Sequence, residues 1–281
     1  METQKILIAL GSPSDKDKII SSFHHFNLSK KYPVDYYLSV ASAHRTPELV
    51  ESHALEHSWD AIIAGAGLSN VLASEYLKYA DLTTVIVGLP ISDTKSKGLT
   101  SFLSTSELPS GYPVATVGID RIDSALHLAN YLVQNRFNSI SLIYAAENQT
   151  LEKAIRTLDE LGVKYSTQIR NRAICGHDIP KNELPLYIIS PEVVKRCQSF
   201  GSAVESYIAC FDLGMEPFLE DYLSYSRENG HLAFINSGEN LAVYGAKVLA
   251  RNDRGLKDRI ESYLEKGKGK YSEYENLISL S

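Results

Sequence analysis

The sequence predicts an α/β protein built on a doubly wound parallel sheet. Two observations lead to this class: short β-branched apolar runs recur along the chain, and helical patterns with apolar residues at three- and four-residue spacing separate them. Regular alternation of strands and helices implies parallel strands covered by helices on both faces. The ligand crevice of such a sheet lies at the carboxyl ends of its strands, so functional residues are expected in the loops that follow the strands.

The first 134 residues contain five strand and helix pairs. The predicted strands are 6–10, 34–40, 61–64, 84–89 and 114–117. The predicted helices are 16–26, 47–56, 71–80, 98–105 and 123–134. Gly11 suits a tight exit from the first strand, and Pro47 suits the first turn of the second helix.

The same rhythm restarts after Gln134. Strands are predicted at 139–144, 163–169, 186–190, 207–211 and 232–235, and helices at 150–161, 191–199, 216–227, 240–250 and 256–266. The halves also correspond in letters, since SAHRTP aligns with CGHDIP and GYPVATVGID with GHLAFINSGE. We therefore expect one domain repeated in tandem, a catalytic domain at 1–136 and a degenerate copy at 137–281 that ends in a helix and a tail. Two unrelated α/β domains are the alternative.

Composition narrows the class of protein. The 281 residues are 44% hydrophobic with a net charge of −6, an ordinary globular balance without the basic excess of a nucleic-acid-binding surface. The longest apolar stretch, 83–91, is well short of the roughly 20 residues that span a bilayer. The first residues lack the basic region and cleavage site of a secretion signal, and the three cysteines form no C-x-x-C pair. We expect a cytoplasmic protein that binds neither nucleic acid nor membranes.

The loop after the first strand is a candidate anion site. Ser12, Ser14 and Asp15 favour capping of the helix that follows, and free N–H groups at a helix start attract a phosphate or a carboxylate. The two serine hydroxyls add further donors. The alternative for this loop alone is a well-capped turn without a ligand.

The loop after the second strand carries Ser42, Ala43, His44 and Arg45. Imidazole moves protons near neutral pH, and guanidinium is the side chain best shaped to grip a phosphate. Because this loop ends at the same edge of the sheet as the first, we expect His44 and Arg45 to face the anion loop.

The loop after the third strand reads AGAGLSN and includes Gly67, Ser69 and Asn70. It is no dinucleotide fingerprint, because Asn70 replaces the third glycine and the motif follows the third strand. Small residues here let a ligand or a neighbouring subunit approach the main chain. His53 and His57 lie four residues apart but lack a third ligand, so we expect no metal and no cofactor.

Four motifs in order, GSPSD, SAHRTP, AGAGLSN and LPSGYPVATVGID, resemble the purine-biosynthetic family that contains aminoimidazole ribonucleotide carboxylase and N5-carboxyaminoimidazole ribonucleotide mutase. The resemblance covers about residues 4–135. It implies a flavodoxin-like three-layer domain and a homo-oligomer with active sites at subunit contacts. It also implies a nucleotide phosphate and ribose held by Ser12, Ser14, Asp15 and Arg45, with His44 as the proton-transfer residue. The other expected substrate contacts are Gly11, Ser42, Ala43, Gly67, Ser69, Asn70, Ser92 and Asp93.

The family has two branches, and the chain resembles both. Ser69-Asn70, Pro90-Ile91-Ser92-Asp93 and LPSG are similar to the carboxylase branch, whereas SAHR is the mutase spelling. We therefore expect carboxylation of aminoimidazole ribonucleotide by carbon dioxide, with the mutase reaction as the alternative. A carboxylase of a pyridinium nucleotide and a non-catalytic nucleotide-binding module are further hypotheses.

The second copy departs from these motifs. Ala145-Ala146-Glu147-Asn148-Gln149 stands where the first copy has its anion loop, and Asp178 stands where it has Arg45, although His177 persists. We expect a non-catalytic half that replaces a neighbouring subunit or lines the site of the first half. The basic, glycine-rich segment 266–270 is predicted to be a flexible connector.

Overall fold

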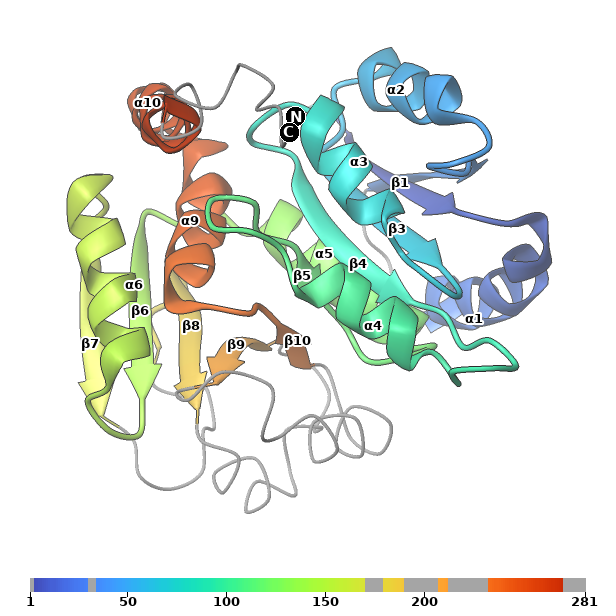
Figure 1. Cartoon of the computed structure of the whole chain (residues 1–281). Helices are drawn as coiled ribbons and strands as arrows, with labels where there is room; N and C mark the ends of the chain where they lie inside the picture. Colours follow the sequence, from blue (N-terminus) through green and yellow to red (C-terminus); the bar gives the residue numbers. More distant parts are fainter. Residues whose placement is uncertain (1–2, 30–33, 170–178, 190–206, 212–231, 270–281) are drawn as a thin grey trace, which may run out of the picture.

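A ten-stranded sheet runs through both halves of the chain in the computed structural model, which describes residues 3–29, 34–169, 179–189, 207–211 and 232–269 (Figure 1). The strands are β1 Gln4–Leu10, β2 Val34–Val40, β3 Ala61–Ala66, β4 Val85–Pro90, β5 Ala115–Thr116, β6 Ser139–Tyr144, β7 Tyr165–Ile169, β8 Glu183–Ile189, β9 Tyr207–Phe211 and β10 Leu232–Phe234. The helices are the 3-10 turn η1 Pro13–Asp15, α1 Lys16–Ser29, α2 Pro47–Glu56, α3 Leu72–Tyr79, α4 Leu99–Ser106, α5 Ile122–Gln134, α6 Gln149–Glu160, α9 Gly238–Ala250 and α10 Arg254–Gly269.

The two halves have the same strand order. The first half is arranged β2-β1-β3-β4-β5, and the second is β7-β6-β8-β9-β10, which is the same order counted from residue 137. Within each half the paired strands are parallel. This is the doubly wound α/β class that the sequence predicts, and the matching order is what a tandem repeat requires. A common origin of the halves stays a prediction.

The halves meet at β5 and β10, which pair antiparallel through Thr116 and Phe234. The strand direction therefore reverses once across the sheet. No periodicity in the sequence predicts this reversal. The first half has three layers, because alternate side chains of each strand point to opposite faces. Ile6 and Ile8 of β1 pack in the cluster that contains α1 and α5, whereas Leu7 packs with α2 and α3.

The predicted elements agree closely with the observed ones where the structure describes them. β5 is the main shortfall, since only two residues pair where four were expected. α6 and α9 are present, and α9 begins two residues earlier than predicted because Ser237 caps it and accepts a hydrogen bond from the Asn240 N–H at 3.2 Å. The predicted helices 191–199 and 216–227 lie outside the described residues.

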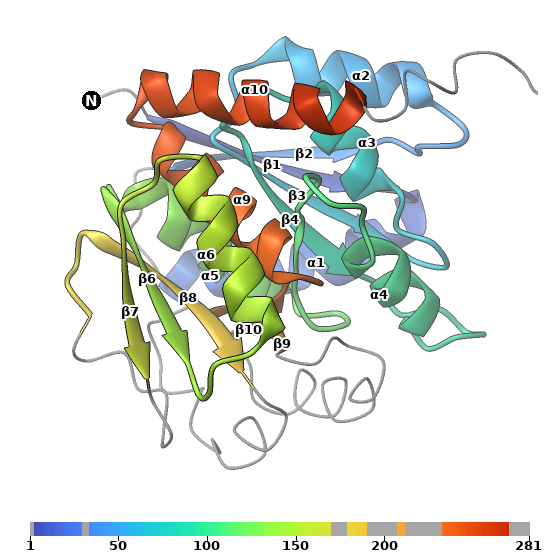
Figure 2. The ribbon, with the colours of Figure 1, turned by 60° about the vertical axis from the view of Figure 1, so that its left-hand side comes forward.

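The last helix corrects one prediction. α10 continues to Gly269, so residues 266–269 are helical and not a connector. Figure 1 shows α10 end-on above α6 and α9, and Figure 2 shows it lengthwise along the top of the molecule. Its Lys257 reaches Asp81 of the first half at 2.7 Å, and its Lys266 lies 3.7 Å from Glu160 of the second. None of the described helices is both long and apolar enough to cross a bilayer.

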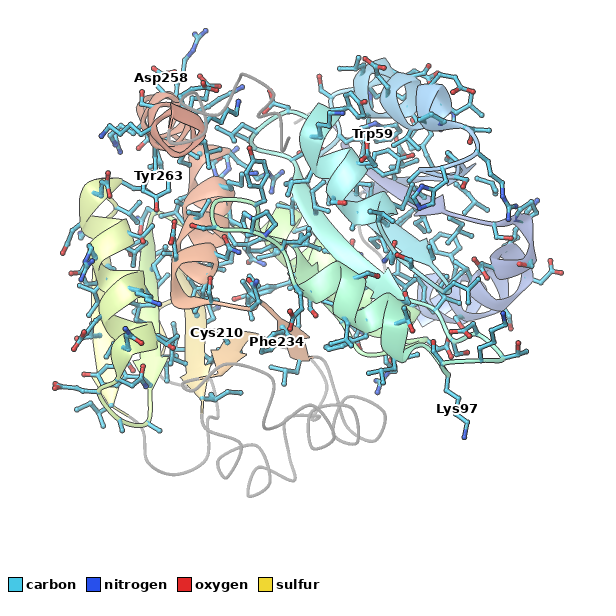
Figure 3. All side chains as sticks on the ribbon, in the orientation of Figure 1. Trp59, Lys97, Cys210, Phe234, Asp258 and Tyr263 are labelled. Atoms are coloured by element: carbon cyan, nitrogen blue, oxygen red, sulfur yellow. The ribbon has the colours of Figure 1, made fainter. Side chains whose placement is uncertain are left out.

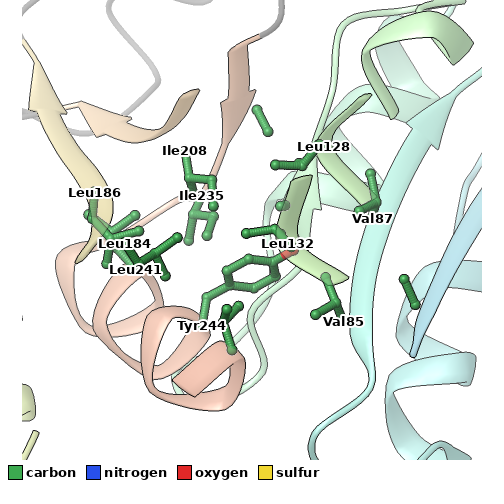
Figure 4. Packing of buried hydrophobic residues seen from close by; sticks show 14 of the residues in the cluster. Val85, Val87, Leu128, Leu132, Leu184, Leu186, Ile208, Ile235, Leu241 and Tyr244 are labelled. Carbon is green, nitrogen blue, oxygen red and sulfur yellow. The ribbon is translucent and has the colours of Figure 1, made fainter. Parts of the chain in front are cut away.

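One apolar core crosses the junction between the halves. Tyr244 of α9 is at its centre, with side chains of both halves around it: Val85, Val87, Leu128 and Leu132 from the first, and Leu184, Leu186, Ile208, Ile235 and Leu241 from the second (Figure 4). The Tyr244 hydroxyl donates to the main-chain oxygen of Ile86 at 3.3 Å. Burial raises the pKa of Tyr244 far above its usual range, so this hydroxyl stays protonated.

Lys247 is a cation buried in the same junction. It lines a cavity of about 10 Å³ with Leu77, Pro113 and Tyr244. Burial lowers the pKa of the Lys247 ammonium from 10.5 to about 8, and attraction by Asp81 offsets only part of that shift. Folding therefore places an ammonium group in an unfavourable environment at neutral pH.

Lys247→Met is expected to stabilise the protein at pH 7 by about 2 kcal/mol, because it removes that buried charge. Between about pH 8 and about pH 10.5 the unfolded chain holds a proton on Lys247 that the folded chain lacks, so wild-type stability rises with pH in this window. The advantage of the variant should thus shrink as pH rises from 7 to 10. Thermal unfolding across that range measures it, with Lys153→Met on the exposed face of α6 as control. A variant less stable than wild type at pH 7 would contradict the expectation.

Candidate functional site

The ends of the first four strands meet at one edge of the sheet. The Gly11 N–H donates to the Gly65 oxygen at 2.8 Å, and the Ala41 N–H donates to the Leu10 oxygen at 2.9 Å. The Ile91 N–H donates to the Ala66 oxygen at 3.0 Å. These bonds connect the starts of the four loops that follow β1 to β4. The candidate residues in these loops therefore lie along the same edge of the sheet.

The first loop approaches the third closely at Gly11. A Cβ atom there would lie 2.9 Å from the Ala66 Cβ, so only glycine fits. Beyond it, Ser12 caps η1: its hydroxyl oxygen accepts from the Ser14 N–H at 3.3 Å and lies 2.8 Å from the Ser14 hydroxyl. Asp15 is buried. The loop therefore presents two adjacent hydroxyls at the start of a helix, as the anion-site prediction requires.

The second loop is a hydrogen-bonded turn with the candidate side chains His44 and Arg45 at its tip. The Ser42 hydroxyl accepts from the Arg45 N–H at 3.3 Å, and the Thr46 hydroxyl accepts from the Ser42 N–H at 2.9 Å. The Thr46 N–H closes the turn on the Ser42 oxygen at 2.9 Å. The side chains of His44 and Arg45 are exposed at the tip, free to meet a ligand.

The third loop depends on Asn70, which is fully buried. Its side-chain amide donates to the Ala64 oxygen at 3.0 Å and to the Leu89 oxygen at 3.4 Å, so it ties the ends of β3 and β4 together. Asn70 therefore braces these two strand ends, and its contact with the substrate stays a prediction. Gly67 and Ser69 lie nearer the surface, and Leu68 between them has a left-handed φ of 33°.

The fourth loop is organised by Asp93. Its Oδ1 accepts from the Lys95 N–H at 2.7 Å and the Ser96 N–H at 2.8 Å, and its Oδ2 accepts from the Gly98 N–H and the Ser96 hydroxyl. Hydrogen bonds from the Ser96 hydroxyl and these N–H groups hold the pKa of Asp93 well below its usual range. Asp93 is thus an anionic cap of the loop, with Ser92 beside it.

Two features of this edge escaped the sequence prediction. Lys97 is exposed at the tip of the fourth loop in a left-handed conformation, with φ of 53°, and Figure 3 shows it projecting from this edge. Lys95 is exposed on the same loop, so the fourth loop adds two exposed cations to Arg45 at this edge. The segment KSKG at 95–98, which follows the end of a predicted strand, is the sequence feature that could have indicated these two lysines. The second feature is α4, which holds the third loop from behind through Ser101 and Ser104.

The second half presents a different loop at its corresponding strand end. Asn148 caps α6 by accepting from the Leu151 N–H at 2.8 Å, and Glu147 is exposed beside it. A carboxylate at this position opposes binding of a phosphate.

Cys175, His177 and Asp178 lie outside the described residues. Cys210 is a buried thiol in β9. Among the described side chains, no group of three or more His, Cys, Asp or Glu residues is placed to hold a metal ion.

Comparison with known proteins agrees with the motifs. Residues 5–143 match the family described as AIR carboxylase. The chain is 38% identical over 156 residues to the N5-carboxyaminoimidazole ribonucleotide mutase of Methanocaldococcus jannaschii, a match that covers 55% of this chain and 95% of that protein. It is 33% identical to the chloroplastic phosphoribosylaminoimidazole carboxylase of Vigna aconitifolia, over 54% of this chain and 27% of that one.

A solved structure of PurE from Treponema denticola is 25% identical, with a TM-score of 0.36, and the match covers 44% of this chain and 78% of that chain. The family match ends within β6, close to the boundary between the two halves. Nearly the whole length of the Methanocaldococcus jannaschii protein is thus represented in this chain. The chain belongs to the AIR carboxylase family.

Proposed function

We propose that this chain acts in purine biosynthesis as an N5-carboxyaminoimidazole ribonucleotide mutase, which moves a carboxylate from N5 to C4 of the imidazole. The observation that carries the proposal is the exposed pair of His44 and Arg45 on a rigid turn beside the Ser12 and Ser14 hydroxyls. The Methanocaldococcus jannaschii relative bears the mutase name, and this favours the mutase reaction over the carboxylation that the sequence motifs put first.

The proposed roles follow from the chemistry of each group. Ser12, Ser14 and Arg45 hold the phosphate by charge-assisted hydrogen bonds, which fixes the imidazole above His44. His44 gives a proton to N5 as the bond from N5 to the carboxylate carbon breaks and carbon dioxide is released. C4 then attacks the carbon dioxide, and His44 takes the C4 proton, which restores the aromatic ring. The proton balance closes, because the proton given to N5 equals the one removed from C4.

Carboxylation by free carbon dioxide is the second candidate. The resemblance of Ser69-Asn70 and of LPSG to that branch favours it, as does the carboxylase name of the Vigna aconitifolia relative. The two reactions share the second half of the mechanism: in the carboxylase, carbon dioxide comes from solution and the C4 proton leaves to water through His44. The same residues therefore serve either reaction.

The deciding experiment supplies the purified full chain with the N5-carbamate, and separately with aminoimidazole ribonucleotide with and without excess bicarbonate. Formation of the 4-carboxylate is followed by ultraviolet absorbance. Turnover of the carbamate well above the bicarbonate-dependent rate is the expected result. A rate that depends on bicarbonate alone overturns the mutase assignment in favour of the carboxylase. No turnover with any substrate, together with nucleotide binding, identifies a non-catalytic module.

Arg45→Met is expected to raise KM for the nucleotide about 10- to 100-fold with a smaller effect on kcat, because a charge-assisted hydrogen bond to phosphate contributes about 1.5–3 kcal/mol. Steady-state kinetics measure it. Arg156→Met, an equal change of charge on the exposed face of α6, is the control and should leave KM unchanged. An unchanged KM in Arg45→Met would remove this residue from the phosphate site.

A further inference from the structure

A turn of the first half is held by the second half. Residues 109–112 form a type II turn, in which the Tyr112 N–H donates to the Pro109 oxygen at 3.1 Å and Gly111 has the positive φ, 86°, that the third position of this turn requires. This is the LPSG motif, and no residue of it belongs to the candidate site. It lies against the start of α9, more than 120 residues away in the sequence.

The side chain of Asn240 completes the hydrogen bonding of that turn. Its Nδ2 donates to the Leu108 oxygen at 3.3 Å and to the Pro109 oxygen at 3.1 Å, and its Oδ1 accepts from the Gly111 N–H at 2.8 Å. Asn236 adds a bond from its Nδ2 to the Leu108 oxygen at 2.7 Å. Asn240 is 1% exposed, so water cannot replace its amide.

A second contact flanks this one. The Ser110 hydroxyl donates to Oε1 of Glu239, and the Tyr263 hydroxyl donates to the same oxygen at 2.6 Å. Tyr263 comes from α10, and Figure 3 shows it below that helix, on the side that faces the rest of the second half. The start of α9 therefore bonds to the turn directly, and α10 supports Glu239 through Tyr263.

α4 connects this turn to the candidate site. The helix ends at Ser106, two residues before the turn's first bonded oxygen. Its Ser101 hydroxyl donates to the Ala66 oxygen at 2.6 Å, and its Ser104 hydroxyl accepts from the Asn70 N–H at 2.8 Å. At the other end, α4 follows directly on the loop that contains Ser92 and Asp93.

α4 also lies unusually close to the sheet. A Cβ atom on Gly88 of β4 would fall 2.1 Å from Cγ2 of Thr105, so the helix rests on a strand position that only glycine can occupy. Close-packed elements of this kind have low compressibility and transmit strain. A displacement of the turn is therefore carried along α4 to the third and fourth loops.

We propose that Asn240 is a positioning residue for the active site. It anchors the turn at 108–111, and the turn holds α4, which keeps the loops around Asn70 and Asp93 in place. The expected effect on kcat rests on the proposed function, whereas the role of Asn240 in holding α4 does not. Asn240 thereby gives the second half a role in catalysis that needs no nucleotide site of its own.

Asn240→Leu, which keeps the volume and removes every side-chain hydrogen bond, is expected to lower kcat about 10- to 100-fold, since a displacement of about 1 Å near the reacting groups has effects of this size. KM for the nucleotide should change less than about threefold, because Ser12, Ser14 and Arg45, the groups proposed to hold the phosphate, lie on the first and second loops. Asn236→Ala should give a smaller loss in the same direction. Lys257→Met is the matched control: it breaks another contact between the halves, to Asp81 at 2.7 Å, and should leave kcat unchanged.

Hydrogen exchange tests the inference without activity. The main-chain N–H of Asn70, which donates to the Ser104 hydroxyl, should exchange its hydrogen faster in Asn240→Leu, while the main-chain N–H groups of β1 stay protected from exchange. Faster exchange at Asn70 and a lower kcat in Asn240→Leu, with both unchanged in Lys257→Met, support the inference. Unchanged exchange at Asn70 in folded Asn240→Leu overturns it, and so does an equal loss of kcat in Lys257→Met. A wild-type chain without turnover refutes the proposed function alone, and the exchange measurement still decides whether Asn240 holds α4.

Discussion

His44→Asn is expected to lower kcat about a thousandfold, because proton transfer by a positioned side chain contributes roughly 10²–10⁴ to a rate. Asparagine fills a similar volume and keeps a polar tip but cannot exchange a proton near neutral pH. The turn itself does not depend on the imidazole, since its bonds come from Ser42, Thr46 and the main chain. Nucleotide affinity should therefore change less than about threefold.

Single-turnover kinetics with the N5-carbamate measure the chemical step, and titration of the nucleotide measures affinity. His53→Asn is the matched control, because His53 lies on α2 and its Nδ1 is 2.7 Å from the Ser39 hydroxyl, outside the four loops. It should retain wild-type kcat. Turnover that survives in His44→Asn, or that falls equally in both variants, would show that another group transfers the proton.

Gly238→Ala is expected to destabilise the protein by at least about 3 kcal/mol, the upper part of the range for overpacking. A Cβ atom on Gly238 would lie 2.0 Å from the main-chain oxygen of Thr150, and a main-chain atom cannot move aside as a side-chain end can. α6 and α9 would have to separate at this point. Because α9 carries both Asn240 and Tyr244, the junction between the halves should weaken with it.

Thermal unfolding measures this loss, and about 3 kcal/mol corresponds to a midpoint roughly 6–12 °C lower for a chain of this size. Gly267→Ala in α10 is the control, since a Cβ atom there meets nothing within 4 Å and alanine favours a helix more than glycine does. It should be neutral or slightly stabilising. Equal midpoints for wild type and Gly238→Ala would mean that α6 and α9 are not packed as closely as the structure has them.

Local patterns were enough to place most elements. Strands such as β3 and β4 are buried on both faces, so their sequences are continuous apolar runs. A helix such as α5 is buried on one side, so its apolar residues recur every three or four positions. The loops at the strand ends were found for the same reason. Asn70 illustrates the limit: it stands within a polar loop in the sequence, yet its amide is buried against two strand ends.

The fold class, the order of elements and the four loops at the strand ends, including the loop with His44 and Arg45, follow from the sequence alone, since they depend on short-range periodicity and on motifs within a few residues. Three features become visible only in the folded chain: β5 and β10 pair antiparallel, α10 contacts both halves, and Asn240 bonds to the turn at 108–111. These contacts join residues more than 100 positions apart. Their partners are chosen by how packed surfaces fit together, and no local pattern records that choice.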